Sequence, residues 1–315
     1  MKHLICDSVY SNDVVIPSLI RETDHVELLT GYSPVSGYDL ERVESVHLPY
    51  STDWYGVWSG ERRITDDVDD ASIPFMYYGS DKDEIVQNMI EAIQIAQPLK
   101  PQYGVLHACN ANFDELLCRT YSDSDSKILS AFAEMMNEVA SSFGGDMPFE
   151  LALENLWWPG MRMVDTSCYR FLESHLEFDN WSICLDTGHL LIAAGGSDSE
   201  SESIELLNHI VDGYQKDVLD RIRVMHLHNN TSRLFARSFV APDDFCELGH
   251  IGRYSAAYRF ICELDQHRPF TDPSIVGFVE RISPEFVNHE MGAVNPLERV
   301  SDYNIQRSLF KKDYI

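Results

Sequence analysis

Short apolar runs alternate with longer segments of helical period along most of the chain. Residues 181–191, WSICLDTGHLL, show the pattern clearly, because an apolar run with β-branched and aromatic residues is followed at once by polar groups. Such a run is typical of a strand that is buried on both faces, as in a parallel sheet. We predict eight strands of this kind, at residues 2–9, 24–29, 43–49, 103–107 and 149–156, in the first part of 181–191, and at 222–228 and 274–281.

The segments between these runs favour helices. In residues 81–99, for example, Ile85, Met89, Ala92 and Ile93 form one apolar face, and acidic residues stand at the start. The other predicted helices cover residues 13–21, 125–143, 167–176, 202–220 and 255–266. Eight buried strands joined by helices favour a closed parallel (β/α)8 TIM barrel over an open doubly wound sheet. With no linker to divide it, the chain is expected to form a single TIM-barrel domain over residues 1–315.

Two segments do not follow this alternation. Residues 51–80 are aromatic and acidic without a clear period, so we expect a long loop there. Loops of this length are often functional, and a lid over a site and a surface excursion packed on the rim remain equally open. The residues from 283 onward are weakly periodic, and we expect a C-terminal extension that wraps around the outside.

Polar groups stand where successive predicted strands end. They are His47, His107, Glu154, Asp186 with His189, His226 with His228, and Glu280. In an eight-stranded barrel the carboxyl ends of the strands meet at one mouth, where active sites are found. Several carboxylates and imidazoles gathered there would repel each other or take up protons, whereas divalent cations would stabilise them together. The pattern therefore predicts a metal site at the mouth.

The strand-end motifs VHLPY, LHACN, LENL, CLDTGH, MHLHN and VGFVER resemble those of the xylose-isomerase-like barrel superfamily, which includes endonuclease IV and many sugar isomerases and epimerases. The resemblance implies one metal held by Glu154, Asp186, His226 and Glu280. It further implies a second metal at His47 and His107, with Glu154 as the bridging carboxylate.

The resemblance also assigns a role to His189, as a ligand of a third metal or as a histidine that binds substrate. The rest of that third site looks incomplete. Asp243 occupies a ligand-like position, but Phe245 stands where the phosphodiesterase branch has a histidine. His228 or His250 could compensate for it.

Charge and cysteine content narrow the classes of partner. Lys and Arg number 24 against 51 Asp and Glu, for a net charge of −27, so the surface should repel polyanions such as DNA and RNA. The seven cysteines form no C-x-x-C pair, which favours reduced thiols in a cytoplasmic protein. No apolar run is long enough for a signal peptide or a membrane span.

Three functions fit these observations. The first is hydrolysis of a phosphoester or phosphodiester in a small molecule at two zinc, manganese or iron ions. One candidate substrate is a cobamide-type phosphodiester, a bulky ligand that would suit the tryptophans Trp54, Trp58, Trp157 and Trp158. The second is a sugar or sugar-phosphate isomerase or epimerase, in which one metal polarises the substrate while Glu154 and Glu280 shuttle a proton. The third is a metal-binding barrel without catalysis.

Four further residues are predicted to contact substrate: Asn110, Asn155, His228 and Arg233. For Asn110, Asn155 and Arg233, and for Arg281, a role in orienting the metal ligands remains open as well.

Overall fold

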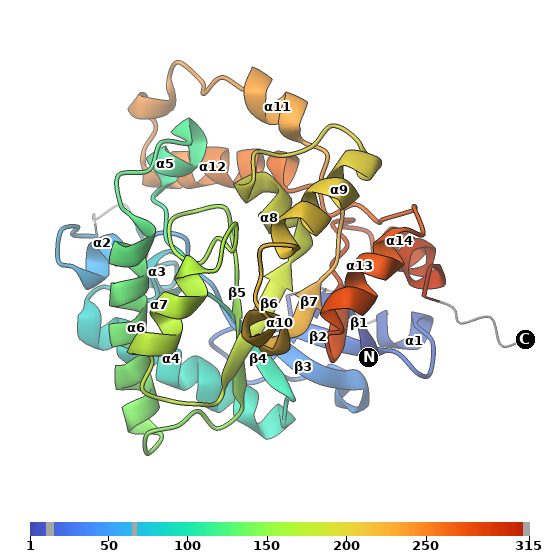
Figure 1. Cartoon of the computed structure of the whole chain (residues 1–315). Helices are drawn as coiled ribbons and strands as arrows, with labels where there is room; N and C mark the ends of the chain where they lie inside the picture. Colours follow the sequence, from blue (N-terminus) through green and yellow to red (C-terminus); the bar gives the residue numbers. More distant parts are fainter. Residues whose placement is uncertain (11–15, 65–67, 311–315) are drawn as a thin grey trace, which may run out of the picture.

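The computed structural model of the chain describes residues 1–10, 16–64 and 68–310. Within them, eight parallel strands follow one another in sequence order around a closed barrel, and the last strand pairs with the first. The helices lie around this barrel (Figure 1). The strands are β1 Lys2–Ser8, β2 His25–Leu29, β3 Val43–His47, β4 Tyr103–His107, β5 Glu150–Glu154, β6 Trp181–Asp186, β7 Ile222–His226 and β8 Phe286–His289. The predicted barrel and its first seven strands are confirmed.

Most of the predicted helices are also present, and some of them begin at a capping side chain. The side chain of Asp81 accepts a hydrogen bond from the Glu84 amide at the start of α4, and Ser124 caps α6 in the same way. The predicted helix at 202–220 is divided into α9 and α10. The start of the one at 13–21 lies outside the described residues.

The α-helices are α1 Ile16–Leu19, α2 Tyr55–Trp58, α3 Ile73–Tyr77, α4 Lys82–Ala96, α5 Phe113–Cys118, α6 Asp125–Ser142, α7 Ser167–His175, α8 Thr187–Ala193, α9 Glu200–Val211, α10 Lys216–Arg221, α11 Arg233–Ser238, α12 His250–Leu264, α13 Ile275–Ile282 and α14 Pro296–Ser308. Short 3-10 turns lie at Leu40–Arg42, Gln97–Leu99 and Phe245–Glu247. Among the helices described, not one combines the length and the apolar character needed to cross a bilayer.

The prediction for the eighth strand is wrong. Residues 274–281 form helix α13 instead, and its buried residues are Ile275, Phe278, Val279 and Ile282. This spacing of three and four residues is that of one helical face, although the run of apolar letters looks like a strand. The barrel is closed by β8, which has only four residues. The segment from 283 therefore completes the barrel before α14 packs near α1 on the outside.

Below the carboxyl ends of the strands, the interior of the barrel is filled mainly with apolar side chains. Leu4, Tyr103, Ala152, Val224 and Phe286 lie together in this interior and are fully or almost fully buried. A larger core occupies the space between the strands and the surrounding helices. The apolar interior supports the mouth from below, where the polar strand ends lie.

The loop at residues 51–80 is packed against the barrel. It contains α2 and α3, and the indole of Trp54 is fully buried and donates a hydrogen bond to the carbonyl of Cys109 at 2.9 Å. Trp58 is buried in the same core. These two tryptophans thus stabilise the loop, and they do not line the cavity at the metal ligands described below.

A buried histidine pair joins β1 to β8 beneath α14. His3 Nδ1 lies 3.0 Å from His289 Nε2, and Gln306 Nε2 donates to His289 Nδ1 at 2.7 Å. The amide of Gln306 is itself fixed, because its oxygen accepts from the Phe270 amide. His289 therefore carries its proton on Nε2 and donates it to His3. Burial, together with the nearby Arg307, lowers the pKa of His3 to about 3.

We expect the His3 pair to make the protein sensitive to acid. The unfolded chain binds a proton at His3 below about pH 6.5 and the folded chain only below about pH 3, so stability is lost as the pH falls from 6.5 towards 3. For His3 alone the loss between pH 8 and pH 5 is about 2 kcal/mol. Urea unfolding at both pH values measures it, and His3→Gln should flatten the dependence by that amount. Parallel pH profiles for the two proteins would contradict this account.

Candidate metal centre

Five successive strands end on a possible metal ligand. The last residues of β3 to β7 are His47, His107, Glu154, Asp186 and His226, and all five side chains are buried. Because the strands are parallel neighbours in one barrel, their carboxyl ends bring these groups to the same mouth. The predicted gathering of these five residues is thus what the structure shows.

Glu154 lies at the centre of this group. Its Oε2 atom is 3.3 Å from His47 Nε2 and 3.2 Å from His107 Nε2. Its Oε1 atom is 3.1 Å from His189 Nδ1 and 3.5 Å from His226 Nδ1. The two carboxylate oxygens therefore face different sets of imidazoles, as a carboxylate that bridges two cations would.

The ring nitrogen of His47 that faces Glu154 is Nε2, and the hydrogen bond made by the other nitrogen decides whether Nε2 can act as a ligand. Its Nδ1 atom donates a hydrogen bond to the carbonyl of Leu48 at 2.8 Å, so in the neutral ring Nε2 carries a lone pair. That lone pair and a carboxylate oxygen would face each other unless a proton or a cation lies between them. Burial alone would lower the pKa of His47, but Glu154 outweighs it and the pKa is raised.

The third carboxylate of the group is Glu290. It directly follows β8, and its Oε2 atom is 3.0 Å from His226 Nδ1. Ligand atoms of Glu154, Asp186, His226 and Glu290 all lie within 4.8 Å of one another. Glu280, the predicted ligand and proton shuttle, is instead exposed on α13. The sequence signal for Glu290 is the run FVNHE, a second apolar run that ends on an acid.

A further group of possible ligands is formed by His189, His228, Asp265 and His267. His189 Nε2 lies 3.0 Å from Asp265 Oδ2, and the rings of His228 and His267 stack at 4.1 Å. Burial alone would raise the pKa of Asp265, but His267 and His189 outweigh it and lower it to about 2. Burial likewise opposes the charge on His267, whereas Asp265 and Glu290 raise its pKa to about 10.

Asp265 and His267 were missed in the sequence, and the residues predicted in their place lie elsewhere. Asp243 is exposed, and Phe245 is buried in the apolar core. His250 bonds to Tyr77 in a different cavity. Asp265 and His267 follow α12, whereas the positions expected from the resemblance, 243 and 245, precede that helix. Counting along the sequence from the family motif therefore did not reach them.

Buried polar atoms without a hydrogen-bond partner collect at this centre. Among the described residues they include Glu154 Oε2, His107 Nδ1, both ring nitrogens of His226, His228 Nδ1, Asp265 Oδ1 and Glu290 Oε2. Each such atom costs roughly 1–3 kcal/mol when it is left unsatisfied. Oxygen and nitrogen donors of this kind suit zinc, manganese and iron, so the residues fit a centre for divalent metal ions.

Asn155 holds two of the candidate ligands in place. Its Nδ2 atom donates to the carbonyl of Asp186 at 3.0 Å, and its Oδ1 atom accepts from the Asp186 amide at 2.8 Å. Its own carbonyl accepts from His189 Nδ1 at 2.9 Å. Of the two roles that the sequence left open for Asn155, these contacts are those of a residue that orients ligands.

Of the other predicted contact residues, His228 lies against Asp186, with His228 Nε2 2.9 Å from Asp186 Oδ2, whereas Asn110, Arg233 and Arg281 have other partners. Asn110 accepts a hydrogen bond from the Tyr55 amide at 2.8 Å and so holds α2. Arg233 on α11 pairs with Asp198 and Glu202, and Arg281 pairs with Asp212 at 2.7 Å. None of Asn110, Arg233 and Arg281 lines the cavity at the metal ligands.

Glu27 lies beneath His226, inside the barrel. It is fully buried on β2, and its carboxylate accepts hydrogen bonds from the Tyr103 hydroxyl at 2.7 Å and from Asn288 Nδ2 at 2.9 Å. Its Oε1 atom is 3.0 Å from His226 Nε2, while His226 Nδ1 faces Glu290 and Glu154. A carboxylate next to the far nitrogen of a ligating histidine fixes the ring and raises its basicity.

Glu27→Gln is expected to lower metal affinity by about 10- to 100-fold, the range for loss of a residue that supports a ligand. The amide keeps the size of the side chain but removes the charge beside His226. Competition with a chelating dye measures the affinity. Tyr103→Phe, which removes one hydrogen bond and leaves the carboxylate, is the matched control. Equal affinity in Glu27→Gln and the unaltered protein, with both folded by circular dichroism, would show that Glu27 only fills space.

The candidate ligands open into a cavity of about 290 Å³, called here the metal cavity. Its walls include His47, His107, Glu154, His189, Asp265, His267, Glu290, Tyr50, Trp157, Trp158 and Tyr258. No Lys or Arg is among its described wall residues. Any attraction for an anionic substrate would therefore come from protonated histidines or from bound cations.

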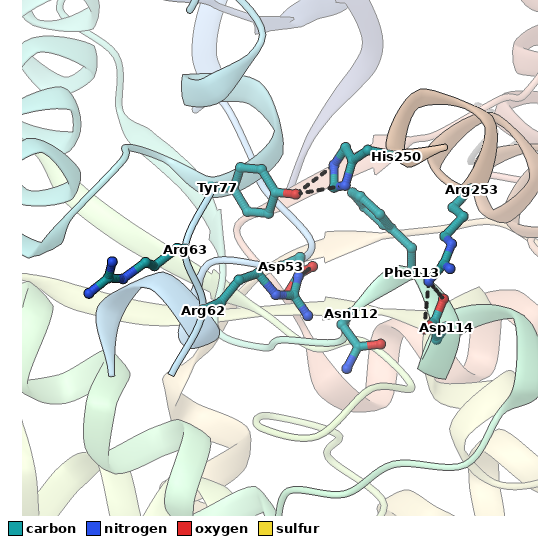
Figure 2. Close-up of a pocket in the computed structure, with 9 residues that line it drawn as sticks. All are labelled: Asp53, Arg62, Arg63, Tyr77, Asn112, Phe113, Asp114, His250 and Arg253. Atoms are coloured by element: carbon teal, nitrogen blue, oxygen red, sulfur yellow. Dashed lines mark hydrogen bonds and ion pairs between the residues drawn. The ribbon is translucent and has the colours of Figure 1, made fainter. Parts of the chain in front are cut away.

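A second cavity, of about 230 Å³, is formed by the loops after β3 and β4 and by α12. Figure 2 shows that Arg62 points towards Asp53 and Arg253 towards Asp114, while the Tyr77 hydroxyl faces His250. Two of its three arginines are thus faced by carboxylates. This second cavity shares no wall residue with the metal cavity. We therefore place the functional site at the metal cavity, which contains the candidate ligands.

Comparisons with known proteins agree with this fold. Residues 69–283, more than half of the chain, match the family model for the xylose isomerase-like TIM barrel. No match was found among curated proteins. A putative xylose isomerase from Rhodospirillum rubrum is 13% identical with a TM-score of 0.55, and the match covers 98% of this chain and 99% of that one.

Two other solved structures show the same fold at 15% identity. A D-tagatose 3-epimerase-like protein has a TM-score of 0.53, with 98% of this chain and 97% of that one covered. Endonuclease IV from Thermus thermophilus has a TM-score of 0.52, with 98% of each chain covered. At identities this low, the matches to these solved structures show a shared fold and nothing more. Together with the family model, they show that the chain belongs to the xylose isomerase-like TIM barrel family.

Proposed function

We propose that the protein hydrolyses a phosphodiester in a small molecule at two or more divalent metal ions. The observation that carries this proposal is the division of Glu154, whose one oxygen faces His47 and His107 while the other faces His226 and His189. A single-metal isomerase would need no second set of imidazoles. Asp186 and Glu290 complete the donors around His226.

The residues of the centre suit this reaction. Bound cations would supply Lewis acidity towards the ester oxygens and a water that ionises near neutral pH. Glu154 would hold the two donor sets at a fixed spacing, and Asn155 and Glu27 would keep Asp186, His189 and His226 in their orientations. In the overall step the oxygen of water bonds to phosphorus, the ester P–O bond breaks, and the leaving oxygen takes a proton.

The substrate of this proposal is small and not a nucleic acid. The chain carries a net charge of −27, and no Lys or Arg is among the described residues of the metal cavity. Tight binding of DNA depends on many contacts between phosphates and Lys or Arg. A cavity of about 290 Å³ fits one diester group and its neighbours. A cobamide-type phosphodiester would have to place that part of the molecule there, with the rest outside.

A sugar epimerase is the second candidate, favoured by a different observation. Glu154, Asp186, His226 and Glu290 form a compact set of four donors for one metal, and it includes two glutamates. Those glutamates could remove and return a proton on the two sides of a substrate carbon. The fold neighbours include an epimerase-like protein as well as endonuclease IV, so the neighbours do not separate the two reactions.

Metal analysis and activity assays together test the proposal. Protein purified without chelator should contain two or more zinc, manganese or iron ions per chain, and should hydrolyse methyl p-nitrophenyl phosphate. Chelation should abolish the activity, and added metal should restore it. His47→Ala should lose one metal. One metal per chain, unchanged in His47→Ala, with activity on ketoses would favour the epimerase. Metal without either activity would leave a binding protein.

A further inference from the structure

A third cavity, distinct from the one in Figure 2, adjoins the metal cavity and is lined mainly by aromatic rings. It has a volume of about 330 Å³, and we call it the aromatic cavity after Tyr10, Tyr50, Phe75, Tyr254 and Tyr258. Tyr50 and Tyr258 also line the metal cavity, as do Leu29 and Thr52. Four shared wall residues make the two hollows direct neighbours, so one ligand could reach into both.

The walls of the aromatic cavity carry no charge. Besides the five rings, the described wall residues are serine, threonine, leucine and proline. The metal cavity, by contrast, contains glutamates, an aspartate and several histidines. In a chain with a net charge of −27, a neutral wall of this kind is a marked local difference. It suits an uncharged group with a flat face, because aromatic side chains stack on such groups.

Three of the five rings are unusually exposed for their size. The exposed fraction is 54% for Tyr10, 44% for Phe75 and 49% for Tyr258. They come from the turn after β1, from α3 and from α12, so the chain brings them together from distant segments. Large aromatic side chains that gather at a hollow without being buried mark a binding site more often than a core.

The rings are held in definite orientations. Tyr10 meets Phe75 edge-on at 6.2 Å, and Tyr254 and Tyr258, one turn apart on α12, lie nearly parallel at 6.0 Å. Tyr10 is also packed over Gly31, where an added Cβ would lie 1.8 Å from the Tyr10 hydroxyl oxygen. The absence of a side chain at residue 31 therefore leaves the space that Tyr10 occupies.

Tyr50 forms the junction between the two hollows. Its ring lies 4.8 Å from the ring of His107 and 5.5 Å from that of His47, both candidate metal ligands. A substituent on a group bound at those histidines would thus pass Tyr50 and enter the aromatic cavity.

We infer that the aromatic cavity is a substrate subsite for a flat, uncharged ring attached to the group that reacts in the metal cavity. This inference rests on the proposed function for the reacting group and adds the substrate class. The substrate has two parts: a metal-binding diester and, on the side that is not released, a neutral aromatic or heterocyclic ring. The ring part would contribute affinity and would fix which ester bond faces the metal ligands.

The test compares two diesters with the same leaving group. p-Nitrophenyl phenyl phosphate carries a ring on the retained side, whereas methyl p-nitrophenyl phosphate does not. Loss of one stacking side chain costs about tenfold. We therefore expect Phe75→Ala to lower the phenyl-to-methyl ratio of kcat/KM by about that factor, and Phe75→Tyr, which keeps a ring, to preserve it.

Two more variants separate ring binding from general damage. Gly31→Ala leaves every ring in the chain but displaces Tyr10, so it should also lower the ratio. Leu297→Ala, at an exposed position on α14, should leave kcat/KM unchanged for both esters. If Phe75→Ala and Gly31→Ala leave the ratio as it is in the unaltered protein, the subsite does not exist.

A binding measurement keeps the inference testable apart from the reaction. If neither ester is hydrolysed by the metal-loaded protein, the proposed function fails, and saturation-transfer NMR with benzamide still examines the aromatic cavity. The unaltered protein should transfer saturation to this flat, neutral probe, and Phe75→Ala should weaken the transfer while Phe75→Tyr retains it. No transfer in the unaltered protein, or equal transfer in all three, would overturn the inference.

Discussion

Glu154→Gln is expected to lower phosphodiester hydrolysis by about a thousandfold or more and to leave at most one metal bound per chain. Glu154 faces both donor sets at once, so the amide would remove the negative charge that both sets share and the ligand oxygen that faces one of them. Loss of several kcal/mol of transition-state stabilisation by the metals corresponds to this factor. Elemental analysis and the hydrolysis assay together measure the effect.

The shape of the side chain is conserved in Glu154→Gln, so the barrel should remain folded. Circular dichroism and the urea midpoint serve as controls. Full metal content with normal activity in this variant would remove Glu154 from the centre. Normal metal content with lost activity would instead assign it to proton transfer, as the epimerase alternative requires.

Glu290→Gln should also abolish most of the activity, whereas Glu280→Gln should not change it. Glu290 lies 3.0 Å from His226 and shares a group of four ligands with Glu154 and Asp186. Glu280 is exposed on α13. The two glutamates are ten positions apart and undergo the same chemical change, so each is the matched control of the other.

We expect Glu290→Gln to lower kcat/KM by at least a hundredfold, since it removes one ligand of the metal that both candidate reactions use. Measurements of kcat/KM and of bound metal on both variants decide the matter. An inactive Glu280→Gln together with an active Glu290→Gln would mean that the eighth strand lies at residues 274–281 after all.

The barrel and most of its mouth could be predicted from the sequence, for a physical reason. Strands such as β6 are covered on both faces, so they appear as continuous apolar runs, and a charged residue at their end stands out. Asp186 and His226 were visible in this way. The regular alternation with helices then placed their carboxyl ends at one mouth.

The eighth strand could not be found by the same reasoning. β8 has only four residues, and two of them, Asn288 and His289, are polar but fully buried. Their partners Glu27 and His3 lie far away in the chain. The run at α13 is longer and more apolar, and only the spacing of its buried residues identifies it as a helix.

Asp265, His267 and Glu27 were missed because each acts through tertiary contacts. Asp265 and His267 lie at the end of α12, where no strand end draws attention to them. Glu27 lies in the middle of β2, and its role depends on Tyr103, Asn288 and His226 from three other strands. Such long-range pairings have no local pattern.

The position of β8 affects how the protein matures. Residues 286–290 both join the two edges of the sheet and deliver Glu290, and they are among the last parts of the barrel to leave the ribosome. A nascent chain that has exposed seven strands therefore has an open sheet edge and an incomplete set of donors. Glu290 therefore joins Glu154, Asp186 and His226 only when the barrel closes.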